Sequence, residues 1–240
     1  MNRALASKGR VMAKATGMPI FSIATASTAV LAELGDLLHW DGFDAVTPAS
    51  GHLLDADTRF GKLVRTAIRL LRQIIGILLA NYKNVHIIIA DDNHGPAGST
   101  WMREMLHSFY ENEPRITVDN SPDTYYCYEF GKTSLFFHHG HKRNIKNIDD
   151  VFANKFREEY GRTKYSFAHL GHLHHSRVEE TNLMLLEQHR TLAAKDAYAS
   201  RGGWLSGREG NIITYSKNTG YLGRVVITPE MINSIDDSMY

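Results

Sequence analysis

The sequence SFAHLGHLHH, residues 166–175, joins a short apolar run to three histidines in four positions. The run at 166–170 has the length and composition of a buried β-strand, and His172, His174 and His175 follow it directly. A lone histidine is usually a satisfied core or surface residue. Neutral imidazoles that gather at a strand end, however, are typical ligands of a divalent metal.

The same arrangement recurs at three earlier strand ends. Gly35-Asp36 follows a predicted strand at 28–34, Asn93-His94 follows one at 85–90, and His138-His139-Gly140-His141 ends one at 134–138. In open α/β sheets, ligands bind in the crevice beyond the carboxyl ends of the strands. We therefore expect these four groups of polar residues to converge on one point.

The remaining pattern predicts a single α/β domain with one mixed sheet or two packed sheets. Helices are expected at 57–82, from about Ser99 to Tyr110 with Ser99 or Thr100 as the cap, and near 148–159. Further strands are expected at 115–118, 125–130, 176–181, 183–189, 211–216 and 221–228, with Gly131-Lys132 turning a hairpin.

Composition restricts the class of protein. With 240 residues and 43% hydrophobic residues, the chain can bury a substantial core, and its net charge of +1 gives no overall attraction to polyanions. A single cysteine excludes an internal disulfide and fits a reducing compartment, so we expect a cytoplasmic protein without a membrane span. The first 32 residues lack acids and could form a signal peptide, but cleavage there would remove the predicted strand at 28–34.

One helix face carries a run of cations. Between residues 57 and 82, the residues Arg59, Lys62, Arg65, Arg69 and Arg72 fall mostly opposite the apolar face. A solvated helix surface explains them most simply, and contact with nucleic acid is the alternative.

Imidazole, carboxylate and amide donors together suit borderline divalent ions. Manganese fits best among the candidates, with iron, zinc or magnesium as alternatives. Two such ions roughly 3.5–4 Å apart can clamp a phosphate and favour the ionisation of water near neutral pH. The expected chemistry is therefore hydrolysis of a phosphoester.

The ordered set Gly-Asp, Asn-His, His-Gly and Gly-His-x-His resembles the calcineurin-like metallophosphoesterases over residues 28 to about 228. Gly35-Asp36-Leu37-Leu38-His39, with Pro48 and Ser50 after it, is similar to the SbcD-like DNA-repair exonuclease branch and to phage-borne phosphoesterases. The resemblance implies a sandwich of two mixed β-sheets flanked by helices, with the first strand of the family missing. It divides the chain into a poorly patterned segment, 1–27, and a metallophosphoesterase domain, 28–240.

The resemblance also implies roles for individual residues. Asp36 would bridge two metals, Asn93, His139 and His172 would complete the second metal, His174 would bind the first, and His94 would be catalytic. His39, Lys142 and Arg143 would contact the substrate, which is expected to be DNA, although water-exposed residues explain all three equally well. A homodimer is compatible with this reading, and a phosphomonoesterase or nucleotide hydrolase is an alternative function.

Two departures from the family pattern bear on activity. No aspartate precedes Asp36 and no histidine precedes His39, so the family's Asp-x-His motif is missing. The box around Asn93-His94 ends in Gly95 in place of an acid, and Asp91 or Asp92 is the candidate substitute for orienting His94. The chain is accordingly expected to be a shortened enzyme, a one-metal enzyme, or a metal- or nucleic-acid-binding relative without turnover.

Overall fold

The computed structural model describes residues 26–38, 40–42, 44, 46, 51, 59–193 and 206–232. The predicted N-terminal segment, 1–27, lies outside this range except for its last two residues. The elements in chain order are β1 (Thr28–Glu33), α2 (Phe60–Asn81), β2 (Asn84–Ile89), α3 (Pro96–Tyr110), β3 (Ile116–Val118), β4 (Tyr126–Phe130), β5 (Thr133–His138), α4 (Asp149–Lys155), α5 (Arg157–Arg162), β6 (Tyr165–Leu170), β7 (Arg177–Glu180), β8 (Leu185–Gln188), β9 (Gly210–Ser216) and β10 (Gly220–Ile227).

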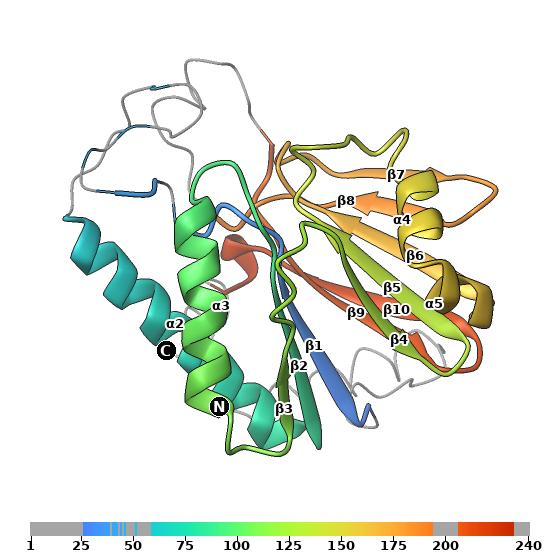
Figure 1. Ribbon diagram of the computed structural model, residues 1–240, viewed down its shortest axis with the longest axis horizontal. Coiled ribbons are helices and arrows are strands. Elements are labelled where there is room, and N and C mark those ends of the chain that lie inside the picture. Colours follow the sequence, from blue (N-terminus) through green and yellow to red (C-terminus); the bar gives the residue numbers. More distant parts are fainter. Residues whose placement is uncertain are drawn as a thin grey trace.

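These elements form two packed sheets with helices on both outer faces, which confirms the predicted α/β sandwich (Figure 1). One sheet has the order β1-β2-β3 and is covered by α2 and α3. The other has the order β4-β5-β6-β8-β7 and is flanked by α4 and α5. The core correspondingly has three parts: one under α2 and α3, one between the sheets, and one under α4 and α5.

The first sheet is built from two β-α-β crossovers. β1 pairs with β2 and β2 with β3, each in parallel. The run Ile87-Ile88-Ile89 is fully buried because one side faces the helices and the other faces the second sheet. In each crossover the helix runs back from the carboxyl edge of the sheet to its amino edge. Consequently α2 and α3 both begin at the edge where β1 and β2 end.

The second sheet alternates its side chains between two core regions. In β5, Leu135 and Phe137 face the first sheet while Phe136 packs under α4. β5 pairs with β4 through a hairpin and with β6 in parallel. Gly131 supplies the positive φ of 61° that the hairpin turn requires.

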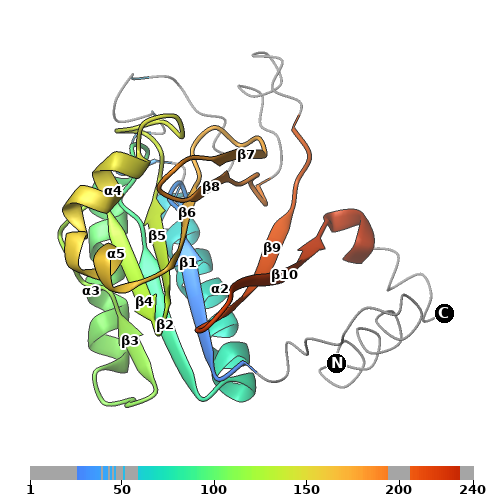
Figure 2. The ribbon, with the colours of Figure 1, turned by 90° about the vertical axis from the view of Figure 1, so that its right-hand side faces the viewer.

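The last two strands form a separate antiparallel ribbon, β9–β10, beside the sandwich (Figure 2). The ribbon reaches the sheets through Tyr215, which packs with Phe167 of β6 at a ring separation of 4.8 Å. It therefore covers the part of the second sheet that lies beyond the first.

In its described part the first sheet is wholly parallel, and the second sheet is mixed. Two sequence predictions are wrong in detail. The predicted helix at 148–159 is two short helices, because the backbone of Phe156 leaves the helical region at φ −107° and ψ 48°.

The second error concerns the start of α3, which begins at Pro96 rather than at Ser99. Pro96 occupies the first turn, where its missing N–H costs nothing. The amides of Ala97 and Gly98 donate to the Asp41 carboxylate, at 2.7 and 3.0 Å, so the cap comes from a distant loop. Among the described helices, none is both long and apolar enough for a membrane span.

Candidate metal centre

The carboxyl ends of the two sheets meet at the loops after β1, β5 and β6. His139, after β5, places its ring Nδ1 2.6 Å from the carbonyl oxygen of Leu34, after β1. The amide of Gly171, after β6, donates to the carbonyl of His139 at 2.9 Å. Loops from both sheets therefore lie at one place.

Three non-glycine residues in the described ranges have a positive φ, and all three are predicted ligands. The φ angle is 63° at Asp36, 70° at His172 and 55° at His174. A left-handed backbone costs such a residue about 1–2 kcal/mol, and residues of this kind cluster at functional sites. The three predicted ligands therefore share a backbone conformation that is unusual for residues with a side chain.

The buried carboxylate of Asp92 holds the loop that carries Asp36. Its Oδ2 accepts hydrogen bonds from the Asp36 amide, at 3.0 Å, and from the Ser99 hydroxyl, at 2.8 Å. Its Oδ1 accepts from the amides of His94, at 2.9 Å, and Gly95. Asp92 thus joins the β1 loop, the β2 loop and the first turn of α3, a role that sequence reasoning missed.

Gly35 is required by the close approach of these loops. A Cβ at this position would lie 2.3 Å from Nδ1 of His139 and 2.8 Å from Cβ of Asp92, and the φ of Gly35 is 98°. Both the space and the backbone conformation exclude a larger residue without rearrangement.

The contacts of His139 define its tautomer. A carbonyl oxygen can only accept, so Nδ1 carries the proton that is donated to Leu34. Nε2 of the same ring lies 3.0 Å from Oδ1 of Asn93 and 3.4 Å from Oδ2 of Asp36. Imidazole nitrogen, amide oxygen and carboxylate oxygen that face one another are ligand types that can share a divalent cation.

Two further atoms support a cation at this point. Oδ1 of Asp36 and Nδ1 of His172 are buried and have no hydrogen-bond partner. Asp36, His139 and His172 each place one potential ligand atom within 4.8 Å of the other two. Because unpartnered buried polar atoms are costly, a divalent cation with mixed nitrogen and oxygen ligands fits these residues.

His174 occupies the rim of the site. Its Nε2 lies 3.7 Å from Oδ2 of Asp36, and 49% of its side chain is exposed, against 1% for His139. It can therefore reach a cation only from the solvent side of Asp36.

The electrostatics of the site favour the protonation states in which aspartate and histidine bind a metal. Burial by itself raises the pKa of Asp36. The hydrogen bond with His174 and the nearby imidazoles of His139 and His94 lower the pKa by more, so the net shift is downward. Burial lowers the pKa of His172. An ionised carboxylate and a neutral imidazole are the forms that bind metal.

Other predicted site residues vary in their closeness to this point. His94 is close enough to affect the pKa of both Asp36 and His172. Lys142 is exposed but close enough to lower the pKa of Asp91, whereas Arg143 is exposed without a contact in the described structure. His39 lies outside the described residues, so its predicted role stays a prediction.

The acid expected beside His94 is present in a different role. Asp92 accepts a hydrogen bond from the backbone amide of His94 at 2.9 Å, and burial raises the pKa of Asp91. The structure therefore supplies an acid that positions the His94 backbone.

His138 and His141 form a second feature that the sequence did not assign. Their rings are stacked at 7°, and Nε2 of His138 and Nδ1 of His141 are buried without a partner. His138 lies on the opposite face of β5 from His139 and stacks on Tyr125 at 4.5 Å. Burial lowers the pKa of His138 to about 3 and that of His141 to about 4, so both are neutral.

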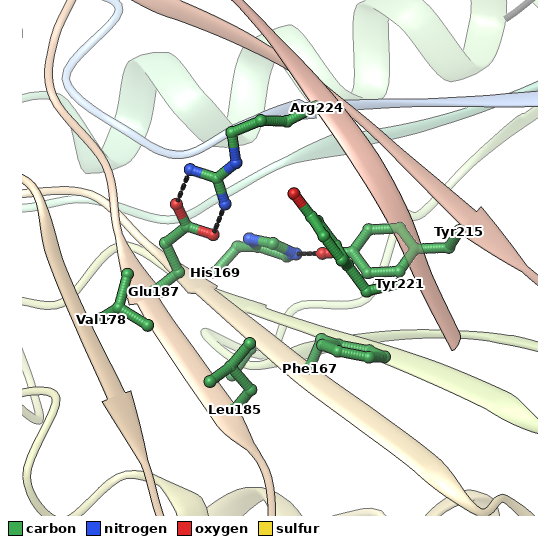
Figure 3. Close-up of a pocket in the computed structure, with 9 residues that line it drawn as sticks. Phe167, His169, Val178, Leu185, Glu187, Tyr215, Tyr221 and Arg224 are labelled. Carbon is green, nitrogen blue, oxygen red and sulfur yellow. Dashed lines mark hydrogen bonds and ion pairs between the residues drawn. The ribbon is translucent and has the colours of Figure 1, made fainter. Parts of the chain in front are cut away.

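A second group of possible ligands lies where the ribbon meets the second sheet (Figure 3). His169 Nδ1 is 2.9 Å from His189 Nε2, and Tyr215 bonds the other nitrogen of His169 at 2.9 Å. Arg224 donates two hydrogen bonds of 2.5 Å to Glu187, which lies 3.9 Å from His189.

This second group is a polar bridge. No buried side-chain nitrogen or oxygen of this group lacks a hydrogen-bond partner, in contrast to Asp36 and His172, and the Arg224 guanidinium already neutralises the Glu187 carboxylate. We define Tyr215, His169, His189, Glu187 and Arg224 as the ribbon bridge, because they tie β9 and β10 to β6 and β8. The candidate metal centre is accordingly the group around Asp36.

Comparison with known proteins gives little beyond this geometry. No protein-family model matches the chain, and no curated protein matches it. Similar solved structures include the following two. A conserved uncharacterized protein from Streptococcus pneumoniae TIGR4, a predicted phosphoesterase, is 12% identical with a TM-score of 0.33 over 66% of this chain and 89% of that one. Vacuolar Protein Sorting 29 from Cryptosporidium parvum is 11% identical with a TM-score of 0.32 over 84% of this chain and 97% of that one. At these TM-scores and identities, neither structure indicates a function for this chain.

Proposed function

We propose that this chain is a metal-dependent phosphoester hydrolase, a phosphodiesterase that acts on DNA. The observation that carries the proposal is the convergence of Asp36, His139 and His172, with two buried and unpartnered ligand atoms, at the carboxyl edge of both sheets. The ordered motifs that resemble the calcineurin-like metallophosphoesterases support the same reading.

The chain offers one complete ligand set. Asp36, Asn93, His139 and His172 would hold one divalent cation, and manganese is the best candidate. When bound, such a cation supplies positive charge that attracts a phosphate group and favours the ionisation of water. A second cation would have only Asp36 and His174 among the described residues, so we propose a single tightly bound ion.

The remaining residues act on the substrate. His94 is proposed to donate a proton to the leaving oxygen of the phosphoester, because it lies beside Asp36 and is held through its backbone by Asp92. Lys142 is proposed to attract the phosphodiester, since its charge already reaches Asp91 in the same loop region. Arg143 follows it along an exposed loop.

A second candidate is a metal-binding protein without turnover. The observation that favours it is the site beside Asp36, where His174 is half-exposed and forms an incomplete set.

Hydrolysis of bis-p-nitrophenyl phosphate with added Mn²⁺ separates the candidates. We expect turnover that falls at least about 100-fold in Asp36→Asn and His172→Asn, because asparagine tolerates the left-handed backbone but replaces the charged carboxylate or the imidazole with a weaker amide ligand. The control is His175→Asn, an exposed histidine whose ring bonds the Leu173 carbonyl and whose backbone carbonyl accepts from Gln188, and we expect it to retain activity. Binding of Mn²⁺ without hydrolysis would favour the non-catalytic protein, and preference for p-nitrophenyl phosphate would favour a phosphomonoesterase.

A further inference from the structure

We propose that the outer face of α2 is the surface that holds the polynucleotide backbone. This face, the basic strip, consists of Arg59, Lys62, Arg65, Arg69 and Arg72. The inference rests on the proposed phosphodiesterase function, because it identifies a nucleic-acid chain as the ligand of the same protein.

The strip is a continuous feature of one helix face. Its members are all exposed, and from Lys62 onward they are spaced three, four and three residues apart, which places them on one side of an α-helix. From Lys62 to Arg72 the strip extends about 15 Å along the helix. Charges in a row of this length match the repeating phosphates of a nucleic acid backbone.

The strip carries unbalanced charge at an energetic cost. α2 contains no Asp or Glu, and within the described structure Arg59, Lys62 and Arg65 make no side-chain ion pair or hydrogen bond. Arg59 and Lys62 also lie at the N-terminal end of the helix, where the macrodipole disfavours cations.

Cations elsewhere in the described chain are commonly paired. Arg115 bonds Glu113 at 2.9 Å, and Arg162 bonds Glu129 at 2.8 Å. A face that served solubility alone would gain from the same mixture of signs. The absence of acids along α2 therefore indicates an external polyanion as the partner.

The position of α2 connects the strip with the candidate metal centre. The β1-α2-β2 crossover places the first turn of α2 at the carboxyl edge of the first sheet, where Asp36 follows β1. α2 and α3 lie together over that sheet (Figure 1), and Arg72 approaches the ring of Phe109 on α3 at 5.9 Å. A bound strand can thus run from the site edge along the strip.

A nucleic acid fits this face better than an anionic membrane does. A helix that binds in a bilayer surface must turn its apolar face outward. The apolar face of α2 is already covered, since Ala67, Leu71 and Ile75 are buried in the core.

The test compares two triple variants with the same loss of charge. Lys62→Gln/Arg65→Gln/Arg69→Gln removes three charges from the strip and retains good helix formers. Lys132→Gln/Lys164→Gln/Lys217→Gln removes three exposed charges near the β4–β5 turn. Binding of a fluorescent DNA duplex is measured by anisotropy in EDTA, from 50 to 200 mM KCl, so that no cleavage occurs.

For the strip variant we expect a loss of about tenfold or more in affinity at 50 mM KCl. The slope of log affinity against log salt should also fall by about 2.7, which is roughly 0.9 for each of three phosphate contacts. The control variant should bind as the wild type does. Equal binding by the strip variant and the wild type would overturn the proposal, as would strip-dependent binding to phosphatidylserine vesicles without strip-dependent DNA binding.

Hydrolysis of bis-p-nitrophenyl phosphate keeps the two proposals distinguishable. The strip variant should hydrolyse this small diester at the wild-type rate, because no strip residue contacts the site. If the wild type fails to hydrolyse it with Mn²⁺ but DNA binding still depends on the strip, the proposed function fails and the surface stands.

Discussion

Replacement of Gly35 by alanine should disrupt both the stability of the protein and its candidate metal centre. The new Cβ would lie 2.3 Å from Nδ1 of His139, far inside van der Waals contact, at a backbone φ of 98°. The His139 ring must then move, which breaks its 2.6 Å bond to the Leu34 carbonyl. The change therefore acts on the loop and on a ligand at once.

The expected cost follows from two contributions. A left-handed backbone costs an alanine about 1–2 kcal/mol, and a buried donor that loses its partner costs about 1–3 kcal/mol. We expect Gly35→Ala to lower the free energy of unfolding by about 2–5 kcal/mol, a large part of the roughly 5–15 kcal/mol that a typical domain possesses.

Urea denaturation and Mn²⁺ titration together check this expectation. Gly76→Ala is the matched control, because a Cβ on Gly76 of α2 meets nothing within 4 Å, and it should stabilise the protein by about 0.5–1 kcal/mol. The packing of His139 against the β1 loop would be wrong if the free energy of unfolding of Gly35→Ala lay within about 1 kcal/mol of the wild-type value and the variant bound Mn²⁺ equally well.

Three further results are expected. Asp92→Asn should lower the free energy of unfolding by about 2–4 kcal/mol, since an amide cannot accept all the hydrogen bonds that the carboxylate accepts; an unchanged urea midpoint would contradict this. Glu187→Gln should cost about 2 kcal/mol and increase hydrogen exchange in β9 and β10, because Arg224 loses its charged partner in the ribbon bridge; unchanged exchange there would contradict the bridge. Stability should fall as the pH drops below about 6.5, because burial lowers the pKa of His138 to about 3 and lowers that of His169 strongly. The unfolded chain then takes up protons that the folded chain does not. At pH 5 each such histidine costs up to about 2 kcal/mol, and equal urea midpoints at pH 7.5 and 5 would refute the reasoning.

The local patterns in the sequence predict much of the fold, because they depend on near neighbours. Strand alternation places His139 and His138 on opposite faces of β5, and the structure has His139 beside Asp36 and His138 against Tyr125. The 3.6-residue period likewise predicts which side of α2 is buried.

Features that depend on distant partners were not predictable in the same way. Ser99 resembles a helix cap, yet Asp41 caps α3 from 56 residues away. Asp92 resembles a substitute for the acid beside His94, but it binds backbone amides of the β1 and β2 loops and the Ser99 hydroxyl of α3. The ribbon bridge joins Arg224 to a residue 37 positions earlier, which no local periodicity encodes.

The central claim is that donors from four strand ends share one divalent cation. The most direct test is an anomalous difference map from crystals soaked in Mn²⁺. We predict one strong peak within coordination distance of Asp36, His139 and His172. A peak at His169, Glu187 and His189 instead, or full occupancy in an Asp36→Asn crystal, would contradict the account.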